Sequence, residues 1–184
     1  MRVIAGQGQG KRLKAPKGLT TRPTTDKIKQ AIFNKLQLEE FGDVLDLFAG
    51  SGGMGIEFLS RDANEAIFVD GDINSIRVIK ENLKTTNLGK NASVYKNDVI
   101  QAIGILGRKG KKFDYIFLDP PYEKGLVEKS LNAIFENDLL KIDGTIIAEH
   151  EKYLDLNSLN IEFEIKDVKR YGDTTITFLN LKEV

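Results

Sequence analysis

D-L-F-A-G-S-G-G-M-G, residues 46–55, is the stretch that decides the fold of this 184-residue chain. It overlaps a short apolar run at 44–48, which is typical of a buried parallel strand, and it leads into an expected helix at 53–61. The G-x-G-x-x-G spacing that starts at Gly50 turns the chain tightly and lets the backbone approach a ligand. In this setting the stretch predicts a site for a nucleoside-containing cofactor.

Strand and helix patterns alternate on both sides of this stretch. Before it, apolar residues at helical spacing predict a helix that Thr24 or Thr25 can cap. After it, we expect strands at 66–69, 92–95, 115–118, 145–148, 161–169 and 174–181, and helices at 73–88, 99–106 and 124–136. This order predicts a doubly wound, Rossmann-like α/β sheet of seven strands, mostly parallel, with an antiparallel C-terminal hairpin.

The charge of the chain is divided unequally along its length. Lys and Arg number 27, and Asp and Glu also number 27, so the formal net charge is zero. Residues 1–37 nevertheless hold nine basic residues and one acid, a net charge of +8, which leaves −8 for residues 38–184. Such asymmetry favours contact with a nucleic acid or a membrane surface. In the expected first helix, Lys27, Lys29 and Lys35 are expected to reach solvent around the apolar stripe.

The composition excludes several classes of protein. The chain has no cysteine, which rules out disulfides, thiolate catalysis and cysteine-ligated metals. Its single histidine, His150, rules out a multi-histidine metal site and is expected to be a hydrogen-bonded structural residue. No apolar run approaches the ~20 residues that span a bilayer, and the N-terminus lacks the apolar region of a signal peptide. We expect a cytoplasmic protein that uses no metal and contacts no membrane.

Three acidic residues near the expected strand ends indicate which cofactor is bound. Asp46 places a carboxylate where a dinucleotide would bring its pyrophosphate, so a cationic ligand such as S-adenosylmethionine is favoured. Asp70 follows Gly50 by 20 residues and can bind ribose hydroxyls, while Asp72 is the better cap for the next helix. Asp98 can accept from an adenine amino group or cap a helix.

Two other functions remain open at this point. The glycine spacing also occurs in NAD-binding oxidoreductases, and Ala49-Gly50-Ser51-Gly52-Gly53 is close to the nucleophile elbow of hydrolases. The elbow normally follows several strands, whereas a single core strand is expected before Ser51, which disfavours the hydrolase.

A second motif, D-P-P-Y at 119–122, follows the expected strand at 115–118. Ligands of open α/β sheets bind beyond the carboxyl ends of the strands, so Asp119 should face the glycine turn. Asp119 and the Pro120 carbonyl can accept the two N–H bonds of an exocyclic amine, and Tyr122 can stack on an extruded base. The motif therefore predicts methylation of a base amine without a metal.

These motifs resemble those of a known family. The segments at 46–57 and 119–122 resemble class I S-adenosylmethionine-dependent amino-methyltransferases, and R-V-I-A-G-Q at 2–7, R-P-T-T-D-K-I-K at 22–29 and R-Y-G-D-T at 170–174 resemble the RsmD family. That resemblance implies transfer of a methyl group to the N2 amine of a guanine in 16S rRNA within the small ribosomal subunit, with S-adenosylhomocysteine as the other product. It also implies an rRNA-binding N-terminal extension and helix at 1–37 and a methyltransferase domain at 38–184.

The resemblance also implies a role for each site residue, and we expect the protein to be a monomer. The catalytic residues would be Asp119, Pro120 and Tyr122. The cofactor-binding residues would be Asp46, Phe48, Gly50, Gly52, Asp70 and Asp98. The substrate-binding residues would be Lys11, Arg12, Arg22, Thr25 and Pro121. The alternatives are an adenine-N6 methyltransferase acting on DNA or RNA, because such enzymes share D-P-P-Y, and a non-catalytic RNA-binding assembly factor.

Overall fold

The computed structural model describes residues 1–17, 25–36, 42–122 and 125–183. The helices are α1 (Asp26–Leu36), α2 (Gly53–Ser60), α3 (Ile73–Thr86), α4 (Val99–Arg108) and α5 (Leu126–Glu136), with 3-10 turns η1 (Gly89–Asn91) and η2 (Leu156–Ser158). The strands are β1 (Asp43–Leu47), β2 (Glu65–Asp70), β3 (Ala92–Lys96), β4 (Phe113–Leu118), β5 (Leu140–Glu151), β6 (Phe163–Tyr171) and β7 (Thr174–Leu181).

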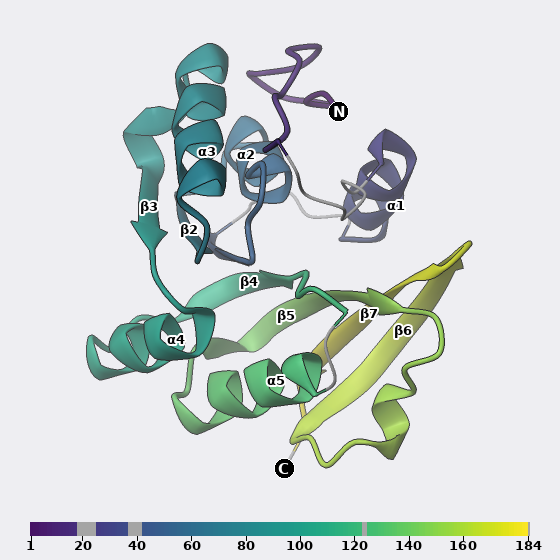
Figure 1. Cartoon of the computed structure of the whole chain (residues 1–184). Helices are drawn as coiled ribbons and strands as arrows, with labels where there is room; N and C mark the ends of the chain where they lie inside the picture. The colour runs from purple at the N-terminus through teal and green to yellow at the C-terminus, as the bar shows by residue number, and fades with distance from the viewer. Residues whose placement is uncertain (18–24, 37–41, 123–124, 184) are drawn as a thin grey trace.

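The strands form one seven-stranded sheet in the order β3-β2-β1-β4-β5-β7-β6 (Figure 1). The pairs β3-β2, β2-β1, β1-β4 and β4-β5 are parallel, and β7 pairs antiparallel with β5 and β6. The doubly wound sheet with its antiparallel hairpin is thereby confirmed. The winding reverses between the adjacent strands β1 and β4, and open α/β sheets bind ligands beyond the strand ends at such a point.

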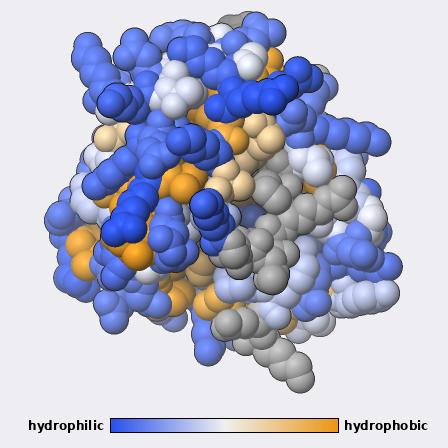
Figure 2. Space-filling view, turned by 45° about the horizontal axis from the view of Figure 1, so that its top comes forward, coloured by the Kyte–Doolittle hydropathy of each residue, from blue (hydrophilic) through white to orange (hydrophobic). Residues whose placement is uncertain are grey.

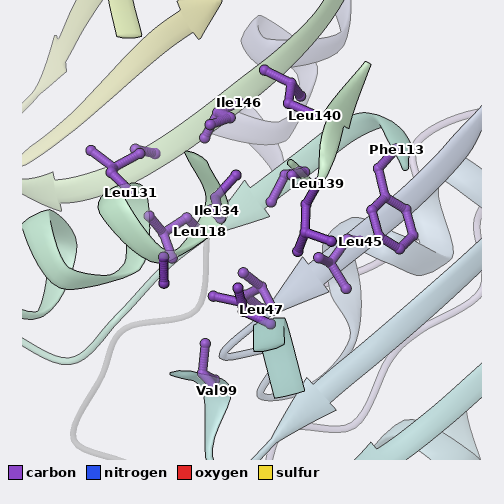
Figure 3. Packing of buried hydrophobic residues seen from close by; sticks show 14 of the residues in the cluster. Leu45, Leu47, Val99, Phe113, Leu118, Leu131, Ile134, Leu139, Leu140 and Ile146 are labelled. Atoms are coloured by element: carbon purple, nitrogen blue, oxygen red, sulfur yellow. The ribbon is translucent and has the colours of Figure 1, made fainter. Parts of the chain in front are cut away.

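Each face of the sheet carries its own hydrophobic core, because alternate residues of a strand point to opposite faces. Helices α1, α2 and α3 cover one face, and α4 and α5 cover the other (Figure 1). In the second core, Leu131 and Ile134 of α5 lie near Leu118 and Ile146 of the sheet (Figure 3). The apolar strands therefore bury both faces, as central strands of a parallel sheet must.

Residues 1–17 pack on the outer side of α2 and α3. Val3 and Leu13 are buried in the first core, and backbone hydrogen bonds from Gln7 to Ser60 and from Gly10 to Val3 hold the segment in place. Most of the face shown in Figure 2 is hydrophilic, with small hydrophobic patches between the polar side chains. No described helix is both long enough and apolar enough to cross a membrane.

Two expectations from the sequence need correction. The sequence predicts a solvent-exposed Lys29, but its side chain is fully buried. Its ammonium group donates hydrogen bonds to Glu57 Oε2 at 3.0 Å and to the Arg2 carbonyl at 2.6 Å, so the buried charge has partners. The strand expected at 145–148 extends over Leu140–Glu151, because β5 pairs with β4 on one side and with β7 on the other.

Candidate active site at the carboxyl ends of the strands

A cavity of about 390 Å³ lies at the carboxyl ends of the central strands. Its size is in the range of small-molecule sites. The loops after β1, β2, β3 and β4 line it, together with Ala15 and Pro16 of the N-terminal segment. Six of the residues that the sequence assigned to catalysis or cofactor binding are among its walls: Asp46, Phe48, Gly50, Asp70, Asp98 and Asp119. The structure therefore brings together the acids that the sequence placed at separate strand ends.

The turn after β1 depends on backbone conformations that glycine adopts easily. Gly50 has a φ of 57° and Gly52 a φ of 74°, both in the left-handed region. Phe48 also has a positive φ of 56°, which is uncommon for a bulky side chain and is typical of strained positions at functional sites. Gly55 allows α2 to approach β2, because a Cβ at this position would collide with the Phe68 ring.

Asp46 has one satisfied and one unsatisfied carboxylate oxygen. Its side chain is buried, with 1% exposure; Oδ2 accepts from the Gly55 amide at 2.9 Å, and Oδ1 has no hydrogen-bond partner among the described residues. Burial raises the pKa of Asp46 to about 8, and the nearby charge of Asp70 adds to the increase while the Gly55 hydrogen bond opposes it. An unpartnered buried acceptor that lines a cavity is suited to a cationic donor from a ligand.

Asp70 and Asp98 accept hydrogen bonds from backbone amides of the loops and helix ends around the cavity. Asp70 accepts from the Gly50 amide and from the Asp72 amide, each at 2.8 Å. Asp72 caps α3 through the Asn74 amide, as expected from the sequence. Asp98 caps α4 by accepting from the Gln101 amide at 3.0 Å. Both carboxylates thus have structural partners and still line the cavity.

The D-P-P-Y segment leaves β4 beside the cavity. Asp119 is partly buried, and its pKa is raised well above the ordinary value by burial and then by the negative charges of Glu149 and Asp46. Pro121 lines the same cavity, and it also lines a second cavity of about 190 Å³ together with Pro120 and Tyr122. Tyr122 is 58% exposed, which leaves its ring available for stacking.

The structure does not support a hydrolase triad at Ser51. The Ser51 hydroxyl accepts from the Gly53 amide at 3.3 Å. His150 is buried, with Nδ1 at 2.9 Å from the Glu151 carbonyl and Nε2 at 2.9 Å from the Thr177 hydroxyl. Burial lowers the pKa of His150. His150 is therefore the hydrogen-bonded structural residue expected from the sequence.

Two residues that the sequence did not single out hold the N-terminal segment against the site. Glu57 accepts from the amides of Ile4 and Ala5, at 2.8 and 3.1 Å, besides pairing with Lys29. Asn82 of α3 donates to the carbonyls of Lys14 and Ser51, both at 2.9 Å, and so links the segment to the glycine turn. The spacing of apolar residues along the sequence cannot identify Glu57 or Asn82 as anchors, because the groups that they bind in the N-terminal segment are distant in sequence.

The expected substrate-binding residues are spread over the surface. Lys11 is exposed and donates to the Thr85 carbonyl at the end of α3, and Arg12 is exposed beside it. Thr25 accepts from the Ile28 amide at 3.3 Å and so caps α1. Arg22 lies outside the described residues.

The strand order, the antiparallel β7 and the acidic cavity beyond β1 and β4 define a Rossmann-like methyltransferase. The sequence model of the family described as "Conserved hypothetical protein 95" matches residues 1–180, and the chain belongs to this family. The resemblance to the RsmD family is confirmed, because the chain is 36% identical to "Ribosomal RNA small subunit methyltransferase D" of Escherichia coli (strain K12) over 82% of this chain and 75% of that protein.

Other comparisons agree with this assignment. The chain is 44% identical to "Putative rRNA methyltransferase YlbH" of Bacillus subtilis (strain 168) over 96% of each protein. The solved structure titled "Putative methyltransferase yhhF from Escherichia coli" has a TM-score of 0.86 and 31% identity over 99% of this chain and 98% of that one. A more distant structure, SMU.776, shares the fold with a TM-score of 0.64 at 15% identity over 76% of this chain and 45% of that one, and its title describes a complex with SAH.

Proposed function

We propose that this protein transfers a methyl group from S-adenosylmethionine to the exocyclic N2 amine of a guanine in small-subunit (16S) rRNA. The observation that carries the proposal is the position of Asp46 and Asp119 in the walls of one cavity, where Asp46 keeps a buried oxygen without a partner. A cationic cofactor and an amine substrate would each provide donors for these two acids.

The residues around the cavity fit this cofactor. Asp46 Oδ1 would accept from the ammonium group of the methionine portion, and the left-handed turn at Gly50 would bring backbone close to it. Asp70 and Asp98 would bind the ribose and the adenine, with Phe48 in the cavity wall. Gly52 does not line the cavity and would act through its left-handed backbone, which shapes the turn. When bound, S-adenosylmethionine supplies an electrophilic methyl group on a sulfonium ion.

The D-P-P-Y segment would hold the target base. Asp119 and the Pro120 carbonyl accept the N–H bonds of the amine, which directs its lone pair toward the cofactor side of the cavity. Tyr122 and Pro121 would contact the ring, and stacking on an exposed tyrosine is worth ~1–3 kcal/mol in single-stranded recognition. Asp119, whose pKa is raised, would also be a suitable acceptor for the proton that the amine loses.

The names of the relatives support an rRNA substrate of the small subunit. We further propose that the subunit or its assembly intermediate is the substrate. Exposed cations of the N-terminal segment, including Lys11 and Arg12, would then contact phosphates. Thr25 would act indirectly, since its hydroxyl fixes the start of α1.

Mass spectrometry of nucleosides from 16S rRNA tests this proposal. A strain that lacks the gene should lose one N2-methylguanosine, and the wild-type gene should restore it, whereas a gene carrying Asp119→Ala should not. Loss of N6-methyladenine would support the adenine methyltransferase instead. An assembly defect with unchanged rRNA methylation would mean that the protein is an assembly factor without this activity.

A further inference from the structure

Asn82 is a polar residue on the apolar side of α3. The buried residues of this helix include Ile76, Ile79 and Leu83, and Asn82 lies among them with an exposure of 1%. Burying an amide costs free energy unless its donors and acceptor find partners, whereas a leucine at this position would carry no such cost. The partners of Asn82 therefore show what this residue holds in place.

The Asn82 side chain makes three hydrogen bonds to backbone groups of two other segments within the described part of the chain. Its Oδ1 accepts from the Lys14 amide at 2.8 Å, and its Nδ2 donates to the Lys14 carbonyl at 2.9 Å. The second N–H of the same Nδ2 is directed to the Ser51 carbonyl, also at 2.9 Å. One amide thus pairs with both backbone groups of Lys14 and with the glycine turn.

Both of the stretches that Asn82 holds form walls of the cavity at the carboxyl ends of the strands. Ser51 lines this cavity as part of the glycine turn, and Ala15 and Pro16, directly after Lys14, line it from the N-terminal segment. Asn82 does not itself line the cavity. The relative position of the two walls therefore depends on a side chain that lies behind them.

The glycine turn is a part of the wall that needs such support. Gly50 and Gly52 flank Ser51 with left-handed backbone, and glycine has more accessible conformations than any other residue. Asp70 holds the Gly50 amide at 2.8 Å, and Asn82 holds the carbonyl of the following residue. A turn that is fixed before the ligand arrives loses less entropy on binding, which raises affinity.

We propose that Asn82 is a positioning residue for the cofactor, which sets the glycine turn and residues 14–16 at the spacing that the cofactor requires. This inference rests on the binding of S-adenosylmethionine proposed above. Asn82 acts through the two walls and without contact to the ligand. The N-terminal segment, which the sequence assigns to rRNA, is by this inference also a part of the cofactor site.

Asn82→Asp tests the inference, because it keeps the acceptor for the Lys14 amide and removes both N–H donors. Affinity for S-adenosylmethionine would be measured by calorimetry with the full chain, at a temperature at which each variant is folded. It should fall at least ~10-fold. In methylation of small subunits the KM for S-adenosylmethionine should rise by the same factor, while kcat stays within ~2-fold of the wild-type value.

The matched control is Thr86→Val, about one turn further along α3. Thr86 is buried, and its hydroxyl donates to the carbonyls of Asn82 and Leu83 within the same helix. This variant should bind S-adenosylmethionine with wild-type affinity whatever its effect on stability. An Asn82→Asp protein that is less stable but has wild-type cofactor affinity would overturn the inference, because a purely structural role produces that result.

A second variant tests the wall without changing the buried amide. Ala15 is exposed and lines the cavity, so Ala15→Trp should fill part of the cavity and lower the affinity at least ~10-fold without lowering stability. Wild-type affinity in this variant would mean that the N-terminal segment is not part of the cofactor site. A wild-type protein that binds no S-adenosylmethionine would contradict the proposed function as well, whereas wild-type affinity in the variants contradicts this inference alone.

Discussion

Glu57 and Asp46 are two buried acids on the same side of the sheet, and their surroundings are opposite. Glu57 accepts hydrogen bonds from two backbone amides, from Lys29 and from Arg61 at 3.0 Å. Asp46 accepts one hydrogen bond, from Gly55, and keeps one oxygen without a partner among the described residues. Burial is complete or nearly complete for both, with exposures of 0% and 1%.

This difference distinguishes an anchor from a binding group. The donors around Glu57 come from α1, from Arg61 at the end of α2 and from the N-terminal segment, so the carboxylate joins three parts of the chain. Asp46 lines a cavity, and among the described residues the Gly55 hydrogen bond to Oδ2 offsets only part of the cost of its burial, since Oδ1 has no hydrogen-bond partner. We therefore expect changes near Glu57 to affect stability and changes at Asp46 to affect binding.

The largest expected effect is on the anchor. Lys29→Met removes the fully buried cation that pairs with Glu57 and leaves the pair with Arg61. Breaking a buried ion pair costs ~3–5 kcal/mol of unfolding free energy, and the remaining cation places the expected loss at the lower end of this range. Denaturant unfolding measures the decrease. Lys27→Met on the exposed side of the same helix is the control and should change stability by less than ~0.5 kcal/mol. Equal stability of the two variants would mean that the Glu57 network does not anchor the segment.

The second-largest expected effect is a loss of cofactor affinity when Asp46 is changed. Asp46→Asn keeps the shape of the side chain but removes the charge that would face the ammonium group. Affinity for S-adenosylmethionine, measured by calorimetry, should fall by ~10–100-fold, since hydrogen bonds to charged groups are worth ~1.5–3 kcal/mol. Unchanged affinity in this variant would contradict the placement of the methionine portion at Asp46.

In the ligand-free protein, the same substitution should change how the free energy of unfolding depends on pH. The pKa of Asp46 is about 8 in the folded protein and near ~3.9 when unfolded, so between these values the folded state binds the extra proton. The contribution of this residue to stability should therefore decrease as pH rises from ~4 to ~8, by up to ~1.4 kcal/mol per pH unit. The free energy of unfolding of Asp46→Asn should depend less steeply on pH, and parallel profiles would contradict the raised pKa.

Much of this architecture could be predicted from the sequence, because apolar periodicity and glycine spacing are local signals. The adjacency of β1 and β4 followed from the parallel order, and the cavity acids followed from their positions after strands. The Glu57 network could not be predicted in this way, since sequence spacing assigns Lys29 to the polar side of an amphipathic helix. Its burial depends on Arg2 and Glu57, which approach it only in the folded chain. The same reason applies to Glu149, whose proximity to Asp119 is a consequence of strand order.

The smallest expected effect extends the comparison to the surface cations of the N-terminal segment. Arg2 pairs with Asp26 and Lys14 with Glu81, so part of the positive charge counted in the sequence is already neutralised. The ion pairs of the described residues do not include Lys11 or Arg12, which leaves both charges for phosphates.

The double variant Lys11→Ala/Arg12→Ala should therefore flatten the dependence of log affinity for the small subunit on log salt. The slope should fall by ~0.7–0.9 for each phosphate that the variant no longer neutralises. The control Lys14→Ala should change the slope less, because its charge is shared with Glu81 at 2.8 Å. If the control flattens the slope as much as the double variant, ion pairing within the protein does not determine which cations bind rRNA. Equal slopes in all three proteins would instead place the phosphate contacts elsewhere on the surface.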